Sequence, residues 1–362
     1  MTDALKAPFP WFGGKSRCAH LVWERFGDVP NYVEPFFGSG AVLLGRPHAP
    51  RTETINDLDC HVANFWRAVQ HAPEEVARWA DAPINEADLH ARHRWLVART
   101  EWRARMMNGA DPDYCDAKIA GWWVWGLSMW IGSGWCSKPE WTGRGSACGN
   151  SGRGINTHRN LPDLKGSKGI HAKRPNMKRG GHGVHRTAQQ VPSLTGFKGV
   201  HQARAGSLLD YFQSLADRLR LVRVCCGDWR RVLGPSPTFL IGLTGVFLDP
   251  PYSVEAGRDA RIYIEDSAGV AQAVREWAVA NGPNPLLRIA LCGYAGEHQM
   301  PDDWECVPWK AVGGYANANS ITTTRGNENA HRERIWFSPH CLPPPQSELF
   351  NFNARGAIPT KK

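Results

Sequence analysis

The sequence lacks the apolar segments that secretion or membrane insertion would require. Residues 1–15 contain no apolar core of a signal peptide. The most apolar stretch, 119–131, is shorter than the ~20 residues that a membrane helix needs. With 42% hydrophobic and 21% charged residues over 362 positions, the composition is that of a soluble globular protein with more than one domain. We therefore expect a cytoplasmic protein without a membrane partner.

Paired metal-ligand or redox cysteines are also missing. The ten cysteines include no Cys-x-x-Cys spacing, so free thiols are expected in an intracellular chain of this length. Cys136, Cys148 and His158 could be considered as zinc ligands, but their spacing matches no established zinc pattern. We expect no metal site.

Acidic residues are nearly absent from residues 132–206, where only Glu140 and Asp163 oppose thirteen basic side chains. The whole chain carries +9, so its basicity is concentrated in this glycine-rich segment. Such a charge favours nucleic acid as the partner. A disordered basic linker is the alternative. The residues expected to contact phosphates and base edges of double-stranded DNA are Lys138, Arg144, Arg153, Arg159, Lys165, Lys168, Lys173, Arg174, Lys178, Arg179, Arg186, Lys198 and Arg204.

The loop at 34–40, Glu-Pro-Phe-Phe-Gly-Ser-Gly, lacks the spacing of two phosphate-binding motifs. Its Gly-x-Gly is not the full dinucleotide fingerprint, and no Lys-Ser/Thr pair follows as in a P-loop. The loop lies between a predicted strand at 31–33 and a predicted helix from Ala41, as in folds that place a glycine loop under an adenosyl group. Glu34 would repel phosphate but suit a cationic ligand.

Acids follow two other predicted strands. Asp57, about 20 residues after the glycine loop, lies where ribose hydroxyls are held in nucleotide-binding folds. Asp59 could instead begin the helix predicted at 61–69 as its N-cap. Asp228 follows the predicted strand 221–226 in the same way. Near the N-terminus, Trp-Phe-Gly-Gly-Lys at 11–15 would let the backbone approach a ligand beside a positive charge, or form a plain turn.

The sequence Asp-Pro-Pro-Tyr at 249–252 ends an apolar run that is typical of a buried strand. Asp249 can accept a hydrogen bond from an amino group, and Tyr252 offers a face for stacking. The prolines donate no backbone hydrogen bond, so the local backbone groups are acceptors. These residues could hold a flat, amino-bearing ring, or they could form a simple surface turn. The residues assigned to this slot are Asp249, Pro250, Pro251 and Tyr252.

Alternating strands and helices on both sides of the basic segment predict one α/β sheet with an insertion. Residues 1–69 and 207–362 would form the sheet domain, 70–131 a helical part of the insertion, and 132–206 its basic recognition region. The Trp-rich stretch 121–130 is favoured as core over a stacking surface. The strands are predicted at 31–33, 53–55, 221–226, 245–248, 287–292 and 334–337.

Together these motifs resemble the Dam-type DNA adenine methyltransferases over most of the chain. The paired Glu-Pro-Phe-x-Gly-x-Gly loop and Asp-Pro-Pro-Tyr sequence carry the resemblance, whereas the basic segment 132–206 departs from it. The resemblance implies a Rossmann-like sheet, S-adenosylmethionine as cofactor, and methylation of the adenine amino group after base flipping. The implied cofactor residues are Trp11, Gly14, Lys15, Glu34, Pro35, Phe36, Gly38, Ser39, Gly40, Asp57, Asp228 and Asp249.

Several points stay open at the level of sequence. Cytosine's amino group could be the target of the same chemistry, and a non-catalytic nucleic-acid-binding protein could share the fold. Charge alone does not separate DNA from RNA. The target sequence and a matching endonuclease are not given by the residues. We expect a monomer.

Overall fold

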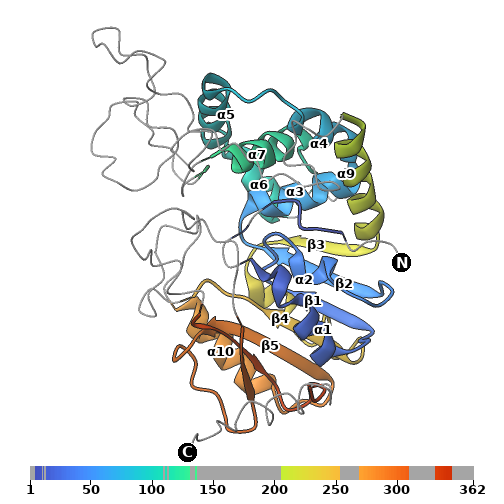
Figure 1. The fold of residues 1–362 in the computed structure, drawn as a ribbon, viewed down its shortest axis with the longest axis vertical. Helices are drawn as coiled ribbons and strands as arrows, with labels where there is room; N and C mark the ends of the chain where they lie inside the picture. The colour runs from blue at the N-terminus through green and yellow to red at the C-terminus, as the bar shows by residue number, and fades with distance from the viewer. Residues whose placement is uncertain are drawn as a thin grey trace, which may run out of the picture.

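One mixed sheet organises the computed structural model (Figure 1), which describes residues 5–9, 11, 14–108, 111, 114–130, 135–136, 205–252, 269–309 and 331–344. Its strand order is β3-β2-β1-β4-β5-β7-β6. The first five strands are parallel, and β7 runs antiparallel to both β5 and β6. This confirms the predicted Rossmann-like sheet. The strands are β1 (Asn31–Glu34), β2 (Thr52–Asp57), β3 (Val222–Cys226), β4 (Thr244–Leu248), β5 (Leu287–Tyr294), β6 (Glu305–Pro308) and β7 (Glu333–Phe337).

The central strands are buried on both faces, as a parallel sheet covered by helices requires. In β4, Val246 and Leu248 pack into a cluster with Val274 of α10 (Val270–Asn281). Phe247 points to the opposite face and joins the main hydrophobic core, which includes Phe26 of α1 (Ala19–Phe26). The alternation of side chains therefore divides the protein into two apolar layers.

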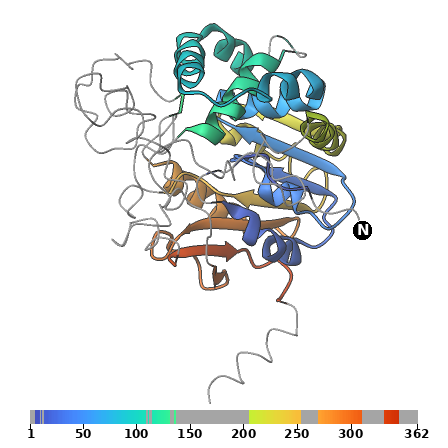
Figure 2. The same ribbon diagram turned by 45° about the horizontal axis from the view of Figure 1, so that its top comes forward.

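A group of helices lies at the β3 edge of the sheet (Figures 1 and 2). In it, α4 packs against α3, α7 and α9, and α3 also packs against α7 and α9; all four helices contribute to the main core. Trp123 and Trp125 of α7 are almost fully buried, which confirms that the Trp-rich stretch is core. The helices of this group are α3 (Cys60–His71), α4 (Pro73–Ala80), α5 (Glu86–Ala98), α6 (Glu101–Asn108), α7 (Ala117–Met129) and α9 (Ala205–Leu219).

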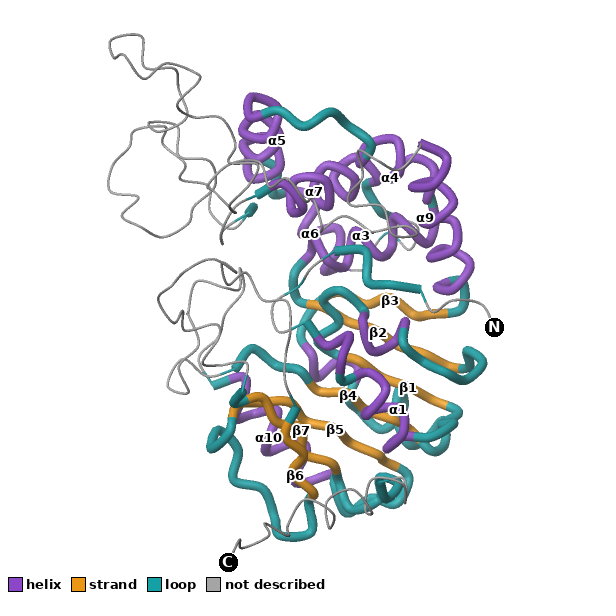
Figure 3. Tube along the Cα trace, viewed as in Figure 1, coloured by secondary structure: helices purple, strands orange, loops and turns teal. Residues whose placement is uncertain are grey.

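Side-chain caps fix where three of these helices begin. The carboxylates or amides of Asp59, Asn85 and Asp116 accept hydrogen bonds from the first turns of α3, α5 and α7, at 2.7–2.8 Å. The helical part of the insertion predicted at 70–131 includes α5 and α6, which are separated by two residues. Two shorter helices, η1 (Lys15–Arg17) and α2 (Ala41–Leu44), precede and follow β1 (Figure 3).

The sequence did not predict β6. Three of its four residues are exposed, and Pro308 ends it, so neither periodicity nor apolar content marks it as a strand. The basic segment 132–206, except for residues 135–136 and 205–206, lies outside the described residues, as do all thirteen of its expected DNA contacts. In the part of the chain that is described, no helix is long and apolar enough to cross a bilayer.

Candidate active site

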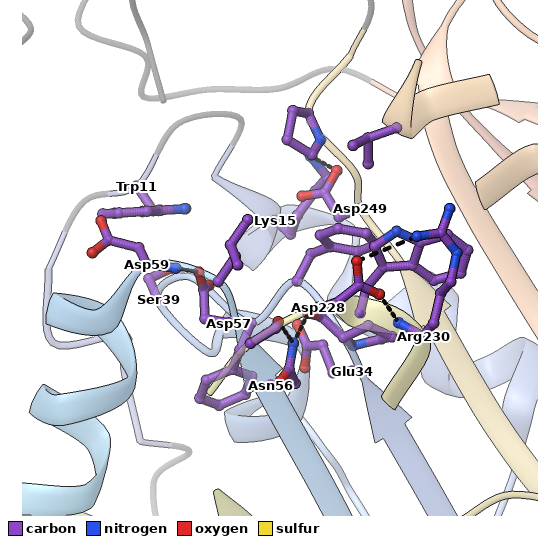
Figure 4. Close-up of a pocket in the computed structure, with 18 of the residues that line it drawn as sticks. Trp11, Lys15, Glu34, Ser39, Asn56, Asp57, Asp59, Asp228, Arg230 and Asp249 are labelled. Carbon is purple, nitrogen blue, oxygen red and sulfur yellow. Dashed lines mark hydrogen bonds and ion pairs between the residues drawn. The ribbon is translucent and has the colours of Figure 1, made fainter. Parts of the chain in front are cut away.

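The carboxyl ends of four parallel strands, β1 to β4, meet at one cavity (Figure 4). This is where open α/β sheets bind their ligands. The loops after the strands supply most of the wall, and η1 and the start of α10 complete it. The lining residues are Trp11, Gly14, Lys15, Glu34, Pro35, Phe36, Phe37, Ser39, Ala41, Asn56, Asp57, Leu58, Asp59, Gly227, Asp228, Trp229, Arg230, Asp249, Pro251, Gly269, Val270 and Ala273.

Asp57 ties the end of β2 to the glycine loop. Its Oδ2 accepts a hydrogen bond from the backbone N–H of Gly38 at 2.9 Å, and its Oδ1 accepts one from the N–H of Asp59 at 2.9 Å. Burial and the charge of Asp59 raise the pKa of Asp57 to about 7, although both hydrogen bonds oppose the shift. The cavity therefore contains a carboxyl that titrates near neutral pH.

The loop needs glycine at position 38. Gly38 has φ +48°, and a Cβ there would lie 2.3 Å from Cδ1 of Trp11. Its carbonyl accepts a hydrogen bond from Nε1 of Trp66 at 2.9 Å. A side chain would strain the backbone and displace Trp11 from the cavity wall.

Asn56 joins two loops of the site. Its Nδ2 donates to the carbonyl of Pro35 at 3.0 Å and to the carbonyl of Gly227 at 2.9 Å. The amide thus holds the loop after β1 beside the loop after β3. Asn56 is 1% exposed, so these bonds form away from bulk water.

Carboxyl groups outnumber cationic side chains on the cavity wall. Glu34 is buried and accepts a hydrogen bond from the Tyr32 hydroxyl at 2.8 Å, and burial raises its pKa well above the usual value. Asp228 is more exposed and pairs with Arg230 at 3.3 Å. A wall of this kind favours hydroxyl, amino or cationic ligand groups over phosphate.

A series of polar contacts begins at Asp249 on the cavity wall and ends at Glu333 in β7. Nζ of Lys15 lies 2.9 Å from Oδ1 of Asp249 and donates to the Tyr252 hydroxyl at 3.1 Å. That hydroxyl donates to Oε2 of Glu333 at 2.7 Å. Burial alone would lower the pKa of Lys15, but the charges of Asp249 and Glu333 outweigh it and raise that pKa well above its ordinary value. Lys15 is therefore a buried, protonated link between the N-terminal and C-terminal parts of the site.

A family model for the D12 class N6 adenine-specific DNA methyltransferase matches residues 11–110. This part of the chain is similar to that family. The match covers the glycine loop, Asp57 and the adjoining helices, and it confirms the resemblance to the Dam-type enzymes. Among curated proteins, no relative matches the sequence.

Most of the residues that the sequence assigned to the methyltransferase site surround this one cavity. Every expected cofactor residue except Gly38 and Gly40 lines it. Those two glycines lie behind the wall, where they shape the loop at φ +48° and +69°. Asp249 and Pro251 also line the cavity. Pro250 and Tyr252 lie behind it, because the Tyr252 hydroxyl is held by Lys15 and Glu333 and its side chain is only 6% exposed.

The sequence patterns assigned no role to several other residues at or beside this cavity. Asn56 and Trp229 flank acids that had been singled out, so their neighbours in the motifs could have drawn attention to them. Arg230 and Val270 on the cavity wall carry no sequence pattern that would mark them, and neither does Glu333, which contacts Tyr252 outside the cavity. Their positions depend on the three-dimensional fold. In the described ranges, no group of three or more His, Cys, Asp or Glu residues could hold a metal ion.

Proposed function

We propose that this chain transfers a methyl group from S-adenosylmethionine to the exocyclic amino group of adenine in DNA. The family match supports an N6 adenine DNA methyltransferase in general. The observation that carries the finer proposal is that one cavity joins the glycine loop after β1 to Asp249 and Pro251 after β4. A donor and an acceptor could therefore be held against each other at the ends of adjacent strands.

The donor set of the cavity fits this cofactor. Asp57 offers a carboxyl where ribose hydroxyls would lie, and Trp229 and Phe36 offer aromatic surface, with ring centroids 6.3 Å apart. Asp228 would accept a hydrogen bond from the adenine amino group, and Glu34 would add a carboxyl suited to a cation; both residues line the cavity. When bound, S-adenosylmethionine supplies an electrophilic methyl carbon.

Asp249 would act on the target amino group. The adenine amino nitrogen is a weak nucleophile because its lone pair is delocalised into the ring, so acceptors aimed at its hydrogens favour the transition state. Lys15 contacts Oδ1 of Asp249. Because an ionised carboxylate has about four acceptor sites, Asp249 keeps acceptor capacity for the amino group. We assign a second acceptor to the carbonyl of Pro250.

The target base would leave the duplex to reach this position, at a cost of a few kcal/mol. We assign stacking of the extruded base to Tyr252, whose hydroxyl accepts a hydrogen bond from Lys15, the residue that also pairs with Asp249. The basic side chains of 132–206, which lie outside the described residues, would hold the DNA and read its sequence.

The decisive test compares the wild type with Asp249→Ala and with Asp303→Ala, an exposed acid far along the chain. DNA incubated with each protein and cofactor is digested to nucleosides and analysed by mass. We expect N6-methyladenine from the wild type and the control, and a loss of at least ~100-fold in Asp249→Ala with DNA binding retained. A wild-type rate in Asp249→Ala would refute the mechanism.

The same digest separates the competing functions. N4-methylcytosine as the product would identify cytosine as the target. A wild-type protein that binds DNA but neither binds cofactor by calorimetry nor modifies a base would be a non-catalytic binder.

A further inference from the structure

Glu333 is a buried carboxyl outside the cavity that contacts the site through Tyr252. It is the first residue of β7, is 4% exposed, and is paired across the antiparallel β5–β7 ladder with Tyr294. Its Oε2 accepts the Tyr252 hydroxyl hydrogen bond at 2.7 Å. Burying a carboxyl costs free energy unless the group is paired, and the hydrogen bond from Tyr252 offsets part of this cost for Glu333.

Two contacts fix the Tyr252 ring from different sides. The hydroxyl is held at one end by Glu333 as acceptor and Lys15 as donor. The ring lies edge-on to Tyr294, with centroids 4.6 Å apart and an interplanar angle of 74°. Since Tyr294 and Glu333 are neighbours in the β5–β7 register, one pair of strands determines both the position and the tilt of Tyr252.

Lys15 lies between two carboxyls. Nζ is 2.9 Å from Asp249 Oδ1, and the Tyr252 hydroxyl links it to Glu333. Burial raises the pKa values of both Asp249 and Glu333, and Lys15 opposes the shift in each case. The tyrosine hydroxyl thus completes a line of four groups that ends on the carboxylate assigned to the target amino group.

We propose that Glu333 is a positioning residue for methyl transfer: by accepting the Tyr252 hydroxyl hydrogen bond, it fixes the aromatic ring against which the target base is aligned with Asp249. This inference rests on the proposed function. Because Glu333 does not line the cavity, its loss should slow the transfer step and leave cofactor affinity nearly unchanged.

The structural half of the proposal can be tested without cofactor or DNA. The protein is labelled with 3-fluorotyrosine, and the ¹⁹F resonance of Tyr252 is assigned as the one that Tyr252→Phe removes. Glu333→Ala should shift or broaden that resonance. Glu305→Gln is the matched control: it alters a glutamate on the adjacent strand β6 that pairs with Arg25 instead, and it should leave the resonance in place. An unmoved Tyr252 resonance in Glu333→Ala would overturn the proposal.

The kinetic half compares kcat with the dissociation constant of the cofactor. We expect Glu333→Ala to lower kcat about tenfold and to change cofactor affinity less than twofold. Glu333→Gln keeps an acceptor oxygen of the same reach and should recover kcat to within about threefold of the wild type. A parallel loss of kcat and cofactor affinity, or a Gln variant as slow as the Ala variant, would overturn the proposal.

A double-mutant cycle tests whether Glu333 acts through Tyr252. Tyr252→Phe removes the same hydrogen bond from its other end, and it carries the test by itself if Glu333→Ala does not fold. The double variant should be no slower than the slower single variant, whereas multiplied losses would overturn the proposal. A wild type that methylates nothing would refute the proposed function instead, and the ¹⁹F result would still report whether Glu333 holds Tyr252.

Discussion

Ionisation of Asp57 should lower the stability of the folded protein and raise its affinity for the cofactor. Its pKa is raised to about 7 by burial and by the charge of Asp59, whereas the ordinary value is 3.8. Between these two pH values the folded state holds more of the Asp57 proton than the unfolded chain does. Stability is therefore expected to fall as pH rises through this window, and the loss should be complete above about pH 7.

The magnitude follows from the size of the shift. About three pKa units correspond to about 4 kcal/mol at ~1.36 kcal/mol per unit. This is an upper limit, because the Asp57 side chain lines a cavity where solvent screens its charge. Asp57→Asn removes the titration but forfeits one of the two backbone hydrogen bonds, at about 1 kcal/mol. Relative to the wild type, the variant should gain up to about 3 kcal/mol between about pH 4.5 and about pH 8, because about 1 kcal/mol of the loss falls below pH 4.5.

Cofactor affinity should move in the opposite direction. A carboxylate accepts hydrogen bonds on both oxygens, whereas an amide offers one acceptor, so Asp57→Asn should bind S-adenosylmethionine about tenfold more weakly. The change in stability is measured by urea unfolding across the pH range, and the change in affinity by calorimetry. Asp228→Asn is the matched control for the stability measurement alone, because it removes an acid of the same cavity whose side chain is about half exposed. Stability curves of Asp57→Asn and wild type that run parallel with pH would refute the reasoning.

Two further predictions concern the glycine loop and the basic segment. Gly38→Ala should destabilise the protein by more than Gly296→Ala. Both residues have positive φ, but only at Gly38 would a new Cβ clash with a neighbour, Trp11. Urea unfolding should show a loss of about 1–2 kcal/mol for Gly296→Ala and a larger loss for Gly38→Ala. Equal losses would mean that Trp11 moves without cost. If about six cations of 132–206 contact phosphates, a plot of log affinity for DNA against log salt concentration should have a slope near −5. The test variant neutralises four of these cations, Lys173, Arg174, Lys178 and Arg179. An unaltered slope in this variant would exclude the four side chains from the DNA interface.

The elements that could be predicted from sequence are those with a local signature. The strand before Asp249 is an apolar run stopped by proline, and it became β4 within one residue of the predicted bounds. Asp59 is the N-cap of α3, as the sequence allowed, while Asp57 lines the cavity. Both are possible because the two carboxylates accept hydrogen bonds from different backbone groups. Short motifs at strand ends were informative because parallel strands bring their carboxyl ends to one edge.

The parts that sequence did not predict depend on contacts between distant residues. Glu333 is 81 positions from Tyr252, and a single glutamate at the start of a strand has no pattern that marks it. The position of Tyr252 outside the cavity wall depends on such contacts too, because its hydrogen-bond partners come from η1 and β7. β6 is recognisable only by its pairing with β7.

The predicted position of the insertion would let the DNA-recognition region vary without a change in the proposed methyl-transfer site. The insertion predicted at 70–206 would begin at the end of α3 and finish at the start of α9, and these two helices pack against each other. Gln70 fastens the junction, since its Nε2 donates to the carbonyls of Leu219 and Val222 at 2.6 and 3.0 Å. The β2–β3 pairing that places Asp57 beside Gly227 is thereby held at the point where the chain departs and returns. Changes in the basic segment should therefore alter DNA affinity and target sequence without moving the carboxyls proposed to hold the cofactor.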